Sequence, residues 1–246
     1  MRGYKTVLLA TAAAMISTGA LADDRKVVKV TNTLDEIRLE ETLNTITVEV
    51  IDQIDTKFQI DQNNSGDISA HTGAWATNVD NYSASAIAIA NNASVDVKGN
   101  TGGSNWQGNW GNVSASVDAD VQNGWGKTEL TAVAIGNNFS LNVAEYGGAV
   151  VSSKQVNDGD ISASLTANVT GQINDVTTSA IAIANNASIQ LPHGSSLVGG
   201  VEQYNNGNVT AYNSTTLRPV RRAIDPATAV AIGNTVSIGN YVPSVQ

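Results

Sequence analysis

The sequence predicts a mainly β fold, a repeat β-solenoid in which coils of chain stack on one another behind a short N-terminal module. A phrase that begins Gln-Asn-Asn-Ser-Gly-Asp at Gln62 returns with its glutamine at positions 107, 155 and 203, in steps of 45, 48 and 48 residues. A second phrase, residues 86–92, returns at residues 132–138, 180–186 and 229–235. Both phrases alternate with a period of two, which indicates strands. So steady a period predicts four stacked repeats of about 47 residues.

Residues 1–22 have the layout of a cleaved export signal. Arg2 and Lys5 precede an apolar run over residues 7–16, and the segment ends in Ala-Leu-Ala before Asp23. That run is shorter than the ~20 residues that a membrane-spanning helix needs, which favours cleavage over a membrane anchor. The chain has no cysteine, which excludes a lipid-anchored bacterial lipoprotein. We therefore expect a secreted protein.

The charge and the lack of cysteine limit the classes of partner and the source of stability. The chain carries a net charge of −9, and loss of two basic residues with the signal would make it −11. Such a surface argues against nucleic acid and anionic membranes as partners. An exported chain without disulfides must be stabilised by packing and backbone hydrogen bonds.

Residues 23–60 are expected to form a charged leader module. Ten of the 22 carboxylates lie between Asp23 and Asp61, whereas the repeats are rich in Asn, Ser, Thr, Gly and Ala. Residues 45–50 alternate and are β-branched, which predicts a strand. Residues 34–43 fit a short helix or another strand equally well.

The four-repeat solenoid is expected over residues 61–240, followed by a tail of residues 241–246. In the first phrase Ile68 and Ala70 flank a serine, and the second phrase has branched residues on one face and alanine on the other. Because 25 residues, about half the period, separate Gly66 from Asn91, each repeat is expected to form about two coils. Four repeats would then give about eight coils and a rod ~38 Å long.

Stacking places equivalent amide side chains above one another, where they can hydrogen-bond along the axis as Asn and Gln ladders do. An amide both donates and accepts, so a ladder satisfies itself. For the asparagines a plain role in turns is an equal alternative, whereas glutamine has no such turn preference. The expected ladder residues are Gln62, Gln107, Gln155, Gln203, Asn91, Asn137, Asn185 and Asn234.

The sequence predicts no metal site, no cofactor and no enzymatic activity. The segment from Asp61 imitates the start of an EF-hand loop, but its twelfth position is Thr72, where a bidentate Glu is required. The aligned column of Asp67, Asn112, Asp160 and Asn208 has no recurring basic partner, and the two histidines are not at equivalent repeat positions. No acid–base constellation is therefore expected.

Four tryptophans gather in the first two repeats and are the candidate sugar-binding residues, because exposed aromatic faces can stack on sugar rings. The alternative is that they pack under loops or close the end of the stack, since large aromatics usually serve burial. The candidates are Trp75, Trp106, Trp110 and Trp125.

Residues 60–240 carry a resemblance at the level of motifs. The recurring Gln-x-Asn-x-Gly-[Asp/Asn]-[Ile/Val] phrase is similar to the Gln-x-Gly-x-x-Asn-x-Ala-x-Val strands of curlins, the subunits of functional amyloid fibres. Residues 131–137 and 228–234 look like the Ser-Val-Ala-Ile-Gly strands of trimeric autotransporter adhesin heads, whose period is much shorter. The combination resembles the curli-like holdfast attachment proteins of stalked bacteria. The second phrase and the charged leader depart from curlins.

This resemblance implies a non-enzymatic adhesin or fibre subunit on the outer surface of a Gram-negative bacterium, which attaches adhesive polysaccharide to the envelope. Its implied partners are further copies or related surface subunits, a curli-type secretion pore and polysaccharide. Unpaired strand edges at the ends of a solenoid invite end-to-end addition, which fits a fibre. The competing hypothesis is a soluble exported carbohydrate-binding or polysaccharide-processing β-helix that acts as a monomer.

Overall fold

The computed structural model describes residues 26–34, 37–38, 41–50, 56–78, 81–124, 126–144, 147–171, 175–218 and 227–241. The expected signal segment, residues 1–22, and most of the expected tail, residues 242–246, lie outside these ranges. Within them the chain forms fifteen β-strands and no helix, so none of the described elements is a helix that could span a membrane.

The strands follow one another in sets of three, and each set makes one coil. The first coil contains β1 (Lys26–Leu34), β2 (Ile37–Arg38) and β3 (Glu41–Val50). The four repeats form the coils β4 (Thr56–Asn64), β5 (Ile68–Thr77), β6 (Tyr82–Lys98); β7 (Thr101–Asn109), β8 (Val113–Gly124), β9 (Lys127–Ala144); β10 (Ala149–Asn157), β11 (Ile161–Gly171), β12 (Asp175–Pro192); and β13 (Leu197–Asn205), β14 (Val209–Arg218), β15 (Ala227–Tyr241).

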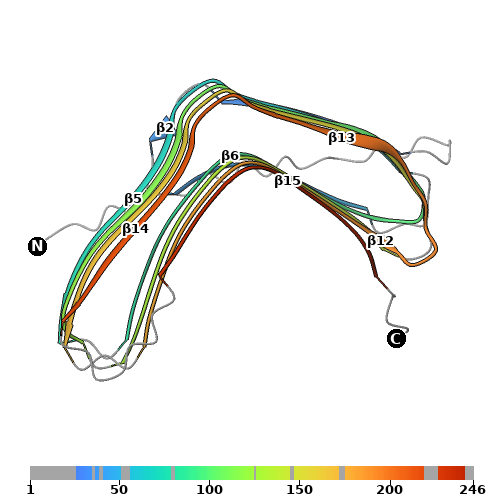
Figure 1. The fold of residues 1–246 in the computed structure, drawn as a ribbon. Helices are drawn as coiled ribbons and strands as arrows, with labels where there is room; N and C mark the ends of the chain where they lie inside the picture. The colour runs from blue at the N-terminus through green and yellow to red at the C-terminus, as the bar shows by residue number, and fades with distance from the viewer. Residues whose placement is uncertain are drawn as a thin grey trace, which may run out of the picture.

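Three parallel five-stranded sheets run along the solenoid. Sheet A has the order β1-β4-β7-β10-β13, sheet B the order β2-β5-β8-β11-β14, and sheet C the order β3-β6-β9-β12-β15. Figure 1 looks nearly along the axis, so that successive coils lie over one another as a bent outline. Sheets A and B form the outer, convex side of the bend, and sheet C forms the inner, concave side. The predicted β-solenoid is thus confirmed.

The expectation of about two coils per repeat is wrong, because each repeat forms a single coil. Gln62 pairs directly with Gln107, and Gln107 with Gln155, so one full period separates neighbouring strands. The two phrases do not stack on each other; the first runs from the end of sheet A round the corner into sheet B, and the second lies opposite in sheet C. Five strands per sheet at ~4.8 Å spacing give a body of about 24 Å, shorter than expected.

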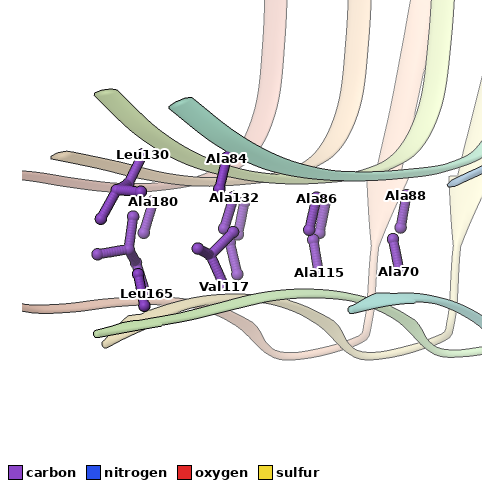
Figure 2. Close-up of a cluster of buried hydrophobic side chains, with 14 of the residues drawn as sticks. Ala70, Ala84, Ala86, Ala88, Ala115, Val117, Leu130, Ala132, Leu165 and Ala180 are labelled. Carbon is purple, nitrogen blue, oxygen red and sulfur yellow. The ribbon is translucent and has the colours of Figure 1, made fainter. Parts of the chain in front are cut away.

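Two apolar cores lie on either side of the bend, and the second contains the phenylalanines Phe58 and Phe139. One packs sheet B against the first halves of the sheet C strands, and the other packs sheet A against their second halves. In the first core alanine faces alanine across the sheets: Figure 2 shows Ala70 opposite Ala88 and Ala115 opposite Ala86. Small residues on both faces allow the two sheets to approach closely, and in this way the alternation seen in the sequence becomes a thin, dry core.

The sheet C strands pass the bend by a local break in their alternation. In β6 both Ala90 and Asn91 are buried, and β9 repeats this at Gly136 and Asn137. In β6 the buried side chains stand at even positions up to Ala90 and at odd positions from Asn91. Those before the shift pack against sheet B, and those after it pack against sheet A. The residue at the shift is small, and a Cβ on Gly136 would lie 2.6 Å from Ala184 O.

The strands of the charged N-terminal segment add one member to each sheet. β1 and β3 pair along their lengths with β4 and β6, but β2 covers only Ile68 and Ser69 of β5. Among the described residues, β5 therefore has no strand on its N-terminal side beyond Ser69. The boundary drawn at residue 60 stays a prediction.

Candidate functional site

The four glutamines form one column inside the bend, between the two cores. The Nε2 of Gln107 donates to Gln62 Oε1 at 2.7 Å, and Gln155 and Gln203 repeat this bond on the preceding coil at 2.7 Å. The second Nε2 hydrogen of Gln155 goes to the carbonyl of Asn186 in sheet C at 2.8 Å, so the column also joins two sheets. Gln62, Gln107 and Gln155 are fully buried, which makes these bonds structural.

The asparagine column lies opposite, on sheet C, and runs in the other direction. Asn91 Nδ2 donates to Asn137 Oδ1 at 2.7 Å, Asn137 to Asn185 at 2.8 Å, and Asn185 to Asn234 at 2.7 Å. Asn91 also donates to the carbonyl of Gly108 at 2.8 Å, across the bend. All eight residues expected to form ladders therefore lie in hydrogen-bonded columns.

Two further asparagine columns were not anticipated. Asn64 Nδ2 donates to Asn109 Oδ1 at 2.7 Å, and the bond repeats from Asn109 to Asn157 and from Asn157 to Asn205. On the outward face of sheet C, Asn186 donates to Asn138 at 2.6 Å, and Asn138 to Asn92. The signal for the first of these is the Gln-x-Asn spacing, which recurs in all four phrases.

The column of Asp67, Asn112, Asp160 and Asn208 caps the corner between sheets A and B. The amide N–H of Asn112 donates to Asp67 Oδ1 at 2.8 Å, and that of Asn208 donates to Asp160 Oδ1 at 2.8 Å. Asn112 Oδ1 accepts from the Asp160 N–H at 3.0 Å. These side chains replace backbone bonds at a turn. In the residues that the structure describes, no group of three metal-ligating side chains gathers.

A histidine, a serine and an aspartate meet on the outer face of sheet B. His71 Nδ1 lies 2.7 Å from Ser116 Oγ and 3.9 Å from Asp118 Oδ2. Both contacts use one ring nitrogen, whereas a catalytic triad needs the serine and the carboxylate on opposite nitrogens. The His71 and Asp118 side chains are 60% and 61% exposed, so water is not excluded. This arrangement is a surface contact.

The candidate sugar-binding tryptophans do not form one cluster. Trp106 and Trp110 pack against each other beside Gly108, with ring centroids 5.6 Å apart, at the outer face of sheet A. Trp75 lies on β5 in sheet B and is 69% exposed, more than any other large hydrophobic side chain that the structure describes. Trp125 lies outside the described residues. Of the three candidate tryptophans that the structure describes, Trp75 is the one with a largely free aromatic face.

Beside Trp75 the outer face of sheet B is hollowed into a shallow cavity of about 320 Å³. The register places Trp75 next to Asp120 of β8, and Gly73 next to Asp118. Asp120 accepts hydrogen bonds at 3.2 Å from Asn168 of the following coil and from Gln122. The cavity is lined by Asp118, Ala119, Asp120, Thr166, Ala167, Asn168, Ser214 and Thr216.

Comparison with known proteins gives one match. A family model described as "HfaD: Holdfast attachment protein D" matches residues 95–246, which is more than half of the chain and includes the last three coils. Neither the curated proteins nor the solved structures gave a match.

Proposed function

Because this chain belongs to the holdfast attachment protein D family, which has a role in holdfast-related attachment at the cell surface or envelope, we propose a specific part for it. It is an exported, non-enzymatic adhesin or fibre subunit that holds adhesive polysaccharide on the outer surface of a Gram-negative cell. Its resemblance to curlin phrases extends the proposal to export through a curli-type pore.

The observation that carries the proposal is the open edge of the last described coil. In the last coil Val236 and Ile238 occupy inner-face positions but are 46% and 55% exposed, whereas their partners Ala187 and Ile189 on β12 are 0% and 1% exposed. Among the described strands, β13, β14 and β15 each pair on one side only. An added coil would bury this apolar cross-section and pair three open edges.

The amide columns favour an added coil with the same pattern. Each glutamine donates to the preceding coil, so a new coil would continue the column by donating to Gln203 Oε1. At the other end of the described stack, β1, β2 and β3 also pair on one side only, but Asn32 stands there at the position of the column glutamine. Addition is therefore directional, with a second copy or a related surface subunit docking on the C-terminal edge.

Multimer formation by the purified chain tests this proposal. The wild type should form SDS-resistant multimers that bind an amyloid dye, and the double variant Val236→Lys/Ile238→Lys should stay monomeric because charges at the end of the core cannot be buried. Val198→Lys is the matched control, since Val198 is 59% exposed on the outer face of the same coil. Multimers of the double variant equal to those of the wild type would exclude the edge as the docking surface.

Attachment itself is tested in the native bacterium. Cells that lack the chain should shed their adhesive polysaccharide, and wild-type chain supplied in trans should restore its retention. Retention without the chain would refute the anchoring role. A wild-type chain that binds sugar but stays monomeric would instead favour a soluble carbohydrate-binding β-helix, a candidate that the cavity beside Trp75 supports.

A further inference from the structure

The cavity on sheet B breaks the repeat at two neighbouring positions. Where β8 has Asp118, the other repeats have Gly73, Thr166 and Ser214; where β5 has Trp75, they have Asp120, Asn168 and Thr216. The structural columns described above keep one residue type or close relatives in every coil. At this place the chain instead collects two carboxylates, one amide and three hydroxyl groups around one cavity, and the aromatic Trp75 is paired next to Asp120 on the neighbouring strand.

Each of these departures is unfavourable in the free protein. Asp118 and Asp120 are two residues apart on one strand face, about 6.6 Å along the strand, so their charges repel each other. The contacts to Asp120 come from neutral amides, and Asp118 lies 3.9 Å from His71 Nδ1 on an exposed surface, beyond hydrogen-bond distance. Trp75 presents 69% of its surface to water on a strand that β2 leaves uncovered. A ligand that pairs with the two carboxylates and covers the Trp75 ring would remove both unfavourable contributions.

The charges and the ring together define the chemistry of that ligand. An anionic polysaccharide would be repelled by the two carboxylates and by a protein of net charge −9. A cationic group beside Asp118 and Asp120 gains from both carboxylates and, over the Trp75 ring, from a cation–π contact. The remaining lining groups, Thr166, Asn168 and Thr216, are hydroxyls and an amide, which suit the hydroxyl groups of a sugar.

We propose that this cavity binds a polysaccharide segment that carries free, protonated amino groups, with a sugar ring stacked on Trp75 and its amine beside Asp118 and Asp120. The lining residues follow the solenoid axis from β8 through β11 to β14, and Trp75 lies on the adjacent strand β5, so the sugar chain lies across the coils. The inference rests on the proposed function in one respect, that the chain holds polysaccharide.

Calorimetric titration of the purified full chain with two probes tests the proposal. A glucosamine tetramer with free amines should bind at least about tenfold more tightly than its fully N-acetylated counterpart, because acetylation removes the charge and leaves the ring. Raising the salt concentration from about 0.05 to 0.5 M should weaken binding of the free-amine tetramer, since exposed charge pairs are screened.

Variants test whether the preference for free amines comes from Asp118, Asp120 and Trp75. Asp118→Asn/Asp120→Asn should abolish the preference for free amines, and Trp75→Ala should weaken both probes. Trp110→Ala and Asp96→Asn are matched controls, because both side chains lie outside the cavity lining, Trp110 directly after β7 and Asp96 on β6. Thermal unfolding midpoints equal to that of the wild type establish that the Asp118 and Asp120 variants are folded.

Three outcomes would overturn the proposal: no binding of the free-amine tetramer, equal affinity for the two probes, or a preference that survives in the double Asn variant. Saturable calcium binding at Asp118 and Asp120 that the free-amine tetramer does not displace would also overturn it. If the amine site is refuted but cells without the chain still shed their adhesive, the anchoring role stands. If such cells retain their adhesive, the anchoring role is refuted but the amine site is not.

Discussion

Gln107 and Gln155 are fully buried polar side chains that lie between two apolar cores. They are tolerated there because each donates to the coil before it, accepts from the coil after it, and reaches a carbonyl of sheet C. A buried polar group costs free energy mainly when it is left unpaired. The columns therefore make one register of coil upon coil much more favourable than any slipped register.

Replacing one glutamine inside the column should show how strongly the stability of the fold depends on the column. Gln155→Leu leaves Gln107 Oε1 without its donor and should lower the free energy of unfolding by about 1–3 kcal/mol. The half-buried Gln203 lies at the end of the column, so Gln203→Leu should cost less, at about 1 kcal/mol. Urea unfolding midpoints at constant m measure the difference. Equal losses for the two variants would contradict a cooperative column.

At the scale of elements, the corner between sheets A and B depends on a stack of glycines. A Cβ on Gly111 would lie 1.9 Å from Gly66 O, one on Gly159 would lie 1.9 Å from Gly111 O, and one on Gly207 would lie 2.0 Å from Gly159 O. The corner peptides of successive coils thus pass closer than any side chain permits. This close approach explains why the recurring phrase has glycine at this point.

Gly159→Ala should therefore push two coils apart in the middle of the solenoid. We expect a loss of at least about 1–3 kcal/mol in the free energy of unfolding, the range for overpacking. Gly200→Ala is the matched control, because a Cβ at Gly200 meets nothing within 4 Å, and it should change stability by about 0.5 kcal/mol or less. Thermal and urea unfolding of both variants check this. A tolerated Gly159→Ala would show that the corner can widen without cost.

At the scale of the whole molecule, each coil contacts only the coils next to it, so stability is a sum of coil and interface terms. Interior coils have two neighbours, whereas the last coil has one among the described residues. The same geometry that makes the C-terminal edge a docking surface makes the last coil the repeat that is least protected against local unfolding. Association and local stability are thus linked at one edge.

Amide hydrogen exchange should show this gradient along the axis. In the monomer, β8, β9, β11 and β12 should exchange slowest, and β13, β14 and β15 should exchange faster, because fewer neighbours hold their bonds. On multimer formation the last coil should gain protection and the interior coils should change little. Exchange at one uniform rate across all repeats would contradict a solenoid of nearest-neighbour coils.

The sequence by itself determined the solenoid and its columns. Equivalent residues lie in columns in any stacked solenoid, so the recurrence of Gln62 at positions 107, 155 and 203 predicted a column. The step of one repeat per coil, which the structure shows, places its members in direct contact. The same step of 45 residues joins Trp75 to Asp120. That neighbour pair was within reach of the sequence once the register was known.

Tertiary structure decided how many coils each repeat makes. A separation of 25 residues between Gly66 and Asn91 is compatible with two phrases that stack and with two phrases that face each other. The alternation of side chains does not distinguish these arrangements, because both bury the same alanines. The pairing of Gln62 with Gln107 shows that one repeat makes one coil, and the packing of Ala70 against Ala88 across the core shows that the phrases are opposite walls of that coil.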